Sequence, residues 1–124
     1  MSINRFPFLL LLSVLTATGA TTALAQSGDS ADTASAIEKG RSVAFNRTKG
    51  NCLSCHAIDG GELPGNSGPP LIGMKDRYPD KEQLRAQIYD PTVRNPNSMM
   101  PPFGKHRVLT KEELDNVVDF VYSL

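Results

Sequence analysis

Cys52, Cys55 and His56 are the residues of this chain whose types and spacing point most directly to chemistry. They form the run Cys-Leu-Ser-Cys-His, with two thiols three positions apart and an imidazole directly after the second. Each thiol of such a motif can add across one haem vinyl group, and the histidine can then ligate the iron. The chain has no other cysteine, so the motif uses all of its thiols. The motif therefore predicts one covalently attached haem c.

Two other chemistries also use closely spaced cysteines. A thioredoxin-like dithiol belongs to a βαβ unit, and the sequence shows no strand-like alternation that would build one. A structural zinc site needs about four ligands, and His106 is the only histidine outside the motif. Haem is the preferred interpretation, and the dithiol and zinc readings remain as alternatives.

A second axial ligand would decide whether the iron passes electrons or binds small molecules. The candidates are Met74, Met99, Met100 and His106. Met100 precedes Pro101-Pro102, which pushes it towards extended backbone and stiffens the segment that carries it. A stiff segment suits a thioether held at a fixed distance, so Met100 is the predicted distal ligand. Met99 and His106 stay open, and Met74 is expected to fill an apolar gap.

Two further features bear on the surroundings of the haem. The second ring nitrogen of His56 needs an acceptor that fixes the ring plane, and the carbonyl of Pro69 is a candidate, although this proline could equally serve the turn alone. Lys105, His106 and Arg107 form a small basic cluster after the Met100 segment. The cluster could steer an acidic partner or pair a haem propionate, or it could be a solvated loop.

The elements that must position these residues are predicted to be helices. The first spans Ala34–Asn46, where Gly40 is unfavourable for a helix and so indicates a close approach by another backbone or by the haem. The second spans Lys81–Tyr89, with Asp80 as its N-cap. The third opens with a capping box at Thr110–Glu113 and runs to the chain end. Its buried stripe is expected to be Leu114, Val117, Val118, Val121 and Leu124.

Glycine- and proline-rich loops are predicted between these helices, over Asn51–Met74 and Asn95–Gly104. The sequence shows no convincing strand and no internal repeat. The predicted fold class is therefore all-α, with three or four helices and ordered loops around one haem. The mature core lacks tryptophan, so the haem is expected to stabilise the fold as well as to carry its chemistry.

The N-terminus resembles a secretory signal. Arg5 supplies a positive charge, and Phe8–Leu15 is apolar apart from Ser13 and too short for a membrane span of roughly 20 residues. Ala23–Ala25 provides small residues at a cleavage point. Export with covalent haem predicts a periplasmic protein. The formal net charge is zero, which gives no electrostatic basis for binding nucleic acid. The predicted parts are a cleaved signal peptide (1–25), a flexible lead-in (26–33) and a cytochrome c domain (34–124).

The segments around these residues resemble the SoxX family, the small monohaem subunits of SoxAX sulfur-oxidation cytochromes. The Cys-x-x-Cys-His run alone indicates only a c-type cytochrome, whereas the Asp-Pro and Met-Pro-Pro-Phe-Gly segments in this order narrow the resemblance. It extends from about Gly40 to the C-terminus. The matching segments are Gly50–Ile58, Pro64–Asn66, Gly68–Met74, Leu84–Pro91, Asn95–Asn97 and Met100–His106.

The resemblance implies a class I cytochrome c fold with His56 and Met100 as axial ligands and the Pro69 carbonyl accepting a hydrogen bond from His56. It also implies an L-cysteine S-thiosulfotransferase complex, which couples thiosulfate oxidatively to a cysteine of the carrier protein SoxYZ. The sulfur chemistry is attributed to the larger haem subunit, SoxA. The smaller subunit then accepts electrons and passes them to another cytochrome.

Two other functions are compatible with a single covalent haem: a freely diffusing electron carrier and a gas sensor. A freely diffusing monohaem carrier must dissociate quickly, so it should surround its haem edge with charge, whereas a subunit should bury a larger and more apolar patch. A haem-based gas sensor would need an open iron site, which the stiff Met100 segment argues against. The chain shows no Ser/His/Asp or paired-carboxylate constellation, so it is expected to transfer electrons and to make no bonds itself.

Overall fold

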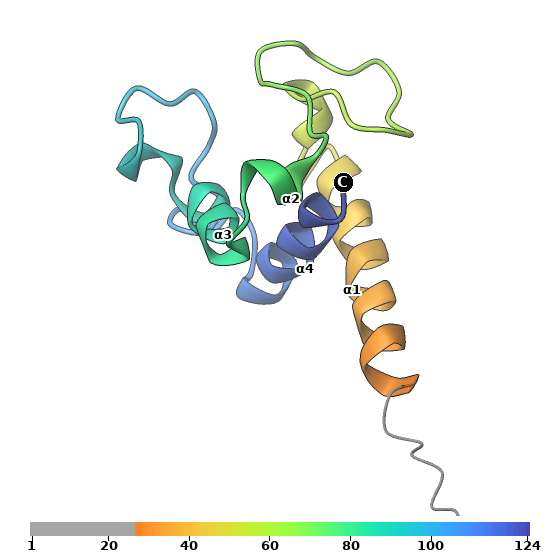
Figure 1. Ribbon diagram of the computed structural model, residues 1–124. Helices are drawn as coiled ribbons and strands as arrows, with labels where there is room; N and C mark the ends of the chain where they lie inside the picture. Colours follow the sequence, from red (N-terminus) through yellow and green to blue (C-terminus); the bar gives the residue numbers. More distant parts are fainter. Residues whose placement is uncertain (1–26) are drawn as a thin grey trace, which may run out of the picture.

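The computed structural model describes residues 27–124 (Figure 1). Over these residues it contains four α-helices and no strand, which confirms the predicted all-helical class with ordered loops. None of the described helices is long and apolar enough to cross a membrane. The predicted signal peptide, residues 1–25, lies outside the described residues. In chain order the elements are α1 (Ser27–Phe45), the 3-10 turn η1 (Cys52–Ser54), α2 (Met74–Arg77), α3 (Lys81–Tyr89), the 3-10 turn η2 (Pro91–Val93) and α4 (Lys111–Tyr122).

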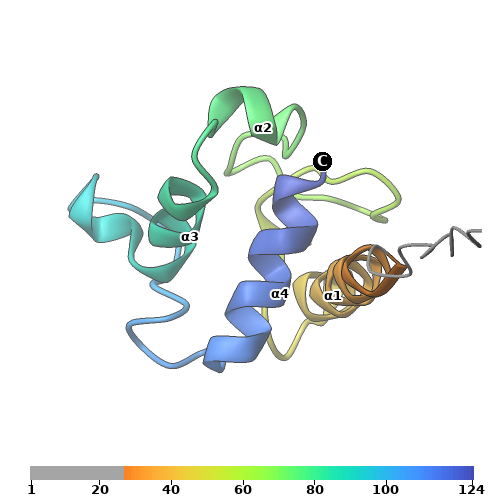
Figure 2. The ribbon, with the colours of Figure 1, turned by 60° about the horizontal axis from the view of Figure 1, so that its bottom comes forward.

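Helix α4 lies between α1 and α3 and forms the centre of the fold (Figures 1 and 2). At its crossing with α1, a Cβ added to Gly40 would lie 1.9 Å from the carbonyl oxygen of Asn116. The prediction that another backbone approaches Gly40 is therefore confirmed. The rings of Phe45 and Phe120 meet edge to face beside this crossing, with their centroids 5.9 Å apart, in a geometry that aromatic pairs prefer.

Helix α1 begins seven residues earlier than predicted, at Ser27 instead of Ala34. The expectation of a flexible lead-in over residues 26–33 is wrong where α1 covers it. This stretch contains one strong helix former, Ala31, and Asp29 in the first turn interacts favourably with the helix dipole. Residues 29–35 are all exposed, and this half of α1 extends away from the rest of the fold (Figure 1).

Helices α3 and α4 begin where their caps predicted. The Asp80 side chain accepts a hydrogen bond from the Glu82 N–H at 2.9 Å. Thr110 and Glu113 form the full capping box, in which each side chain accepts from the backbone N–H of the other. The predicted stripe of α4 is buried, except that Leu124 is half-buried, and Phe120 is also buried although it was not predicted.

The segment Asn51–Met74 was predicted to contain no helix, and this prediction is wrong at both ends. The turn η1 forms directly after Asn51, where the Ser54 hydroxyl donates to the Asn51 carbonyl at 2.8 Å. Helix α2 begins at Met74, whose side chain is only 2% exposed and packs into the core. Helix α2 thus overlaps the predicted loop only at its last residue, where burial of Met74 anchors the first turn. The loop predicted over Asn95–Gly104 contains no helix.

Candidate haem-binding site

A cavity of about 810 Å³ lies between the 51–74 segment and the loop that carries Met100. All five residues predicted for the site line this cavity, so the fold brings together positions that are up to 48 residues apart in the chain. The volume falls within the range of roughly 300–1,000 Å³ that is typical of cofactor pockets. The predicted site residues on its walls are Cys52, Cys55, His56, Pro69 and Met100. Its apolar walls include Leu71, Met74, Leu84, Ile88, Val117 and Val121.

The Cys-x-x-Cys-His run is folded tightly enough to turn both thiols and the imidazole towards one cavity. The carbonyl of Cys52 accepts hydrogen bonds from the backbone N–H groups of Cys55 at 3.2 Å and His56 at 2.9 Å. The Cys55 carbonyl accepts from the Gly68 N–H at 2.8 Å, which ties the run to the following loop. Both cysteines are free thiols. The arrangement offers two attachment points and one nitrogen ligand to a single planar group.

The environment of Cys52 does not favour dithiol chemistry. Burial raises the pKa of its thiol to about 11, whereas the reactive cysteine of a thioredoxin-like pair has a lowered pKa and is present as a thiolate. Zinc is not favoured either, because no cluster of three or more His, Cys, Asp or Glu side chains occurs within residues 27–124. Of the three interpretations of the motif, attachment of haem c fits these observations best.

His56 is oriented by the loop that follows it. Its Nδ1 lies 2.7 Å from the carbonyl oxygen of Pro69, and because a carbonyl only accepts, Nδ1 carries the hydrogen. The hydrogen bond implied by the resemblance is thus present. Gly68 packs against the ring, and a Cβ there would lie 2.4 Å from Cε1 of the histidine. Nε2 keeps its lone pair and is the nitrogen that could ligate a metal.

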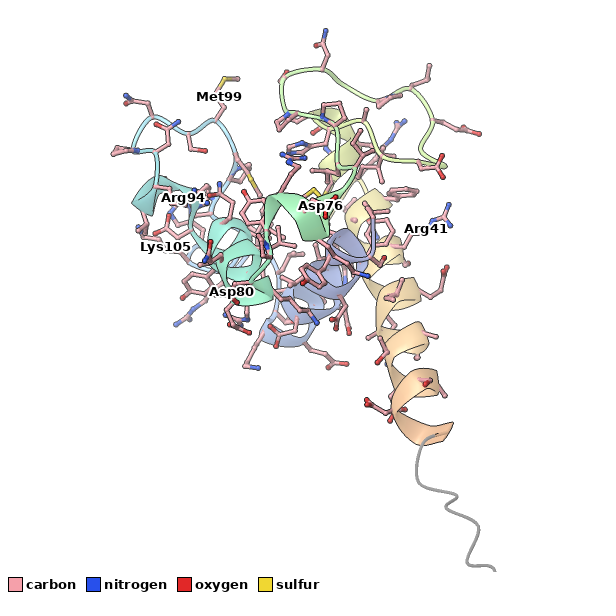
Figure 3. All side chains as sticks on the ribbon, viewed as in Figure 1. Arg41, Asp76, Asp80, Arg94, Met99 and Lys105 are labelled. Atoms are coloured by element: carbon pink, nitrogen blue, oxygen red, sulfur yellow. The ribbon has the colours of Figure 1, made fainter. Side chains whose placement is uncertain are left out.

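The candidate distal ligands differ clearly in position. Met100 is half-buried, lines the cavity and packs against the core. Met99 lies at the rim of the cavity with its side chain 85% exposed, and it extends outward (Figure 3). Met74 is a buried core residue that also contributes to the cavity wall, and His106 is exposed and does not line the cavity. Of the four candidates, Met100 is thus the one that lines the cavity without being either a fully buried core residue or largely exposed.

Three cationic side chains that the sequence analysis did not single out line the cavity: Arg47, Lys49 and Arg77. Arg77 donates from Nη1 to the Pro70 carbonyl at 2.8 Å, and Lys49 pairs with Glu113 on α4. Their only sequence signal is a position close to the motif and to the Pro69-Pro70 turn. They can pair with carboxylates of a bound porphyrin.

The predicted basic cluster is placed differently. None of its members, Lys105, His106 and Arg107, lines the cavity. Lys105 is instead paired with Asp90, with Nζ 2.7 Å from Oδ2. A role of this cluster in holding a haem propionate is therefore not supported, and Arg47 and Arg77 are better placed for it.

An all-helical fold that directs two thiols, an imidazole and a thioether into one cavity defines a monohaem c-type cytochrome domain, which is an electron carrier. Over residues 35–121 the chain matches the family model described as cytochrome c oxidase, cbb3-type, subunit III, and it belongs to this family of c-type cytochromes. Membership and the Cys-x-x-Cys-His run together imply covalent haem c.

Two individual proteins are similar to this chain. The crystal structure of SoxXA from P. pantotrophus contains a chain that superposes with a TM-score of 0.63 at 25% sequence identity, over 70% of this chain and 80% of that one. An uncharacterized lipoprotein of Aquifex aeolicus (strain VF5) is 37% identical over 76 residues, which cover 60% of this chain. The match spans only 37% of that relative's length.

Proposed function

We propose that this protein is the electron-transfer subunit of a periplasmic heterodimer of the SoxAX type, an L-cysteine S-thiosulfotransferase. Thiosulfate is coupled to a cysteine of the carrier protein SoxYZ on the larger, SoxA-like haem subunit. This chain accepts the electrons that are released and passes them to another cytochrome. Both of its thiols belong to the attachment motif, which supports placing the sulfur chemistry on the partner.

Within this proposal each site residue has one role. Cys52 and Cys55 would attach the haem, His56 would provide Nε2 as one iron ligand, and Met100 would provide its sulfur as the other. The hydrogen bond from His56 Nδ1 to the Pro69 carbonyl fixes the plane of the ring and makes Nε2 a stronger donor. A cytochrome with both axial positions filled transfers electrons and excludes substrates from the iron.

The observation that carries the subunit reading is that two segments beside the cavity carry no charge, although Arg47, Lys49 and Arg77 lie on its wall. Residues 63–74 and 95–104, which lie on its two sides, contain no Asp, Glu, Lys, Arg or His. The same segments expose large apolar side chains: Leu63 is 91%, Ile72 64% and Met99 85% exposed. A surface of this kind is typical of a lasting protein–protein contact, and the similarity to SoxXA supports a SoxA-like partner.

The proposal is tested by purifying the protein gently from its own periplasm and measuring native mass and subunit content. We expect co-elution with one larger haem protein, in a complex whose haems are reduced by thiosulfate plus SoxYZ. Elution as a single cytochrome of about the mass of one chain would refute the subunit reading. That result would favour the second candidate, a freely diffusing monohaem carrier.

Periplasmic location is part of the same proposal. It is supported by the secretory pattern of residues 1–25, by the covalent haem that the motif implies, and by the description of the Aquifex relative as a lipoprotein. Cell fractionation with N-terminal sequencing of the purified protein is the direct test. A mature N-terminus at Gln26 is expected, and recovery of the full-length chain in the cytoplasm would contradict the proposal.

A further inference from the structure

The loop that carries Met100 begins directly after Tyr89 and Asp90, and its far end returns to contact the same two residues. At its start, the Asp90 side chain caps η2, with Oδ1 accepting from the Thr92 N–H at 3.1 Å. The Pro91 carbonyl then accepts from the Asn95 N–H at 3.0 Å. These contacts fix where the chain leaves α3.

The end of the loop returns to the same place. The Tyr89 carbonyl accepts from the backbone N–H groups of both Gly104 and Lys105, each at 3.2 Å. Gly104 lies so close to the Tyr89 ring that a Cβ there would be 2.0 Å from Cδ2. The Lys105 ammonium reaches Asp90 Oδ2 at 2.7 Å. Residues 91–104 therefore form a closed loop of the Ω type.

Among the residues that the structure describes, the Asp90 side chain forms polar contacts with both ends of this loop. It is only 7% exposed, and it uses Oδ1 for the start of the loop and Oδ2 for the end. The hydrogen bond from Lys105, followed by that from Thr92, holds the pKa of its carboxyl below its usual value. Residues 95–104 of the loop contain no charged side chain. No other ion pair can therefore close this part of the loop.

We propose that Asp90 is the positioning residue for Met100: by joining both ends of the loop, it holds the methionine sulfur against the iron. The inference rests on the proposed ligation by Met100. Between the two ends, residues 93–97 and 99 are exposed and the Met100 N–H is bound only by the Ser98 hydroxyl, at 3.2 Å. Weakening the Asp90 contacts increases the fraction of molecules with an open loop, and an external ligand then competes better for the iron.

The test uses the haem-loaded protein with the substitution Asp90→Asn, which keeps an acceptor for Thr92 but removes the charge that binds Lys105. In the ferric protein we expect the methionine–iron charge-transfer band to weaken, and the apparent affinity for cyanide to rise about tenfold, because affinity follows the fraction of open molecules. Lys105→Gln should give the same changes. Because the two residues act as one pair, the double variant should add little to either single one.

The matched control is Asp119→Asn, which removes an ion pair between α4 and Lys81 of α3 and leaves the Met100 loop untouched. It should change neither the band nor the cyanide affinity. If Asp90→Asn and Lys105→Gln lower the melting temperature but leave both readouts unchanged, the role of Asp90 is structural only and the proposal is overturned. If Met100→Ala itself keeps the band, the ligation is refuted and the positioning role with it.

Discussion

His56 illustrates how single residues of this protein are controlled by contacts from elsewhere in the chain. The Pro69 carbonyl, thirteen positions away, accepts from its Nδ1, and the backbone of Gly68 lies against the ring. Between them, these contacts leave the imidazole one orientation and one free nitrogen. The rigid Gly68-Pro69-Pro70 turn thus restricts the orientation of the His56 ring directly.

At the residue scale, the first prediction concerns the distal ligand. Met100→Ala should abolish methionine ligation while the haem stays attached, because neither cysteine is altered. Loss of the thioether lowers the reduction potential, by on the order of 0.1 V within the roughly 0.8 V range that axial ligands cover. Redox titration with visible spectra measures both effects. Met99→Ala is the control, and a larger effect of that exposed residue would move the ligand to Met99.

The residues of the motif and Met100 could be predicted from sequence because their signals are local: a fixed spacing in one case and two following prolines in the other. Arg47, Arg77 and Asp90 could not be assigned to the site in this way. Their roles depend on which distant segments meet them, as when Lys105 reaches back across fifteen positions to Asp90. No spacing rule in the sequence carries that information.

At the scale of the elements, the close crossing of α1 and α4 requires a glycine, Gly40, at the point of contact. Gly40→Ala should improve helix propensity by about 1 kcal/mol, but its methyl group would overlap with the Asn116 carbonyl. Overpacking of this kind costs about 1–3 kcal/mol or more, so we expect a net loss of stability. Denaturant unfolding of the haem-loaded protein measures it. Lys39→Ala, at an exposed neighbouring position, should stay within about 0.5 kcal/mol of the wild type.

The first turn of α4 predicts a specific response to acid. The hydrogen bond from Lys49, and then that from the Thr110 N–H, hold the pKa of Glu113 below its usual value of 4.5. The unfolded state therefore binds more protons near that pH, so the stabilisation is complete above the unfolded pKa and is lost as pH falls through the folded pKa.

Glu113→Gln should accordingly flatten the fall of the melting temperature below about pH 4.5. Melting curves of the haem-loaded variants between neutral and acidic pH measure this. Glu112→Gln, one position earlier and exposed, should keep the wild-type slope. An unchanged slope for Glu113→Gln would show that the contact with Lys49 adds nothing to stability in solution.

Helix starts could be predicted well from sequence where the N-cap side chain bonds a backbone N–H two or three positions later, as at Asp80 and Thr110. The same reasoning failed for α2, because its reason to form is the burial of Met74 beneath other elements. It also failed for the start of α1, because residues 27–33 are polar and give no periodic apolar signal, and Ala31 is their only strong helix former.

For the whole molecule, the cavity is too large to be left unfilled without consequence. About 810 Å³ lies within a domain of some one hundred residues, and domains of that size have little stability to spare. The double variant Cys52→Ala/Cys55→Ala, which cannot attach haem, should be largely unfolded. Circular dichroism during heating is the measurement. A cooperative melt like that of the native protein would show that the helices pack well without the haem.

The uncharged segments beside the cavity also have a kinetic consequence. Long-range attraction between opposite charges can raise the rate of encounter well above the basal value of about 10⁵–10⁶ M⁻¹s⁻¹, and ionic strength then lowers it steeply. Residues 63–74 and 95–104 offer no charges for such attraction. Stopped-flow mixing with a redox partner that docks on these two segments should therefore give an association rate that depends on salt only through the nearby cations Arg47, Lys49 and Arg77. Selectivity among partners must then come from the fit of apolar surfaces after contact. A mismatched cytochrome would associate at a similar rate but dissociate faster.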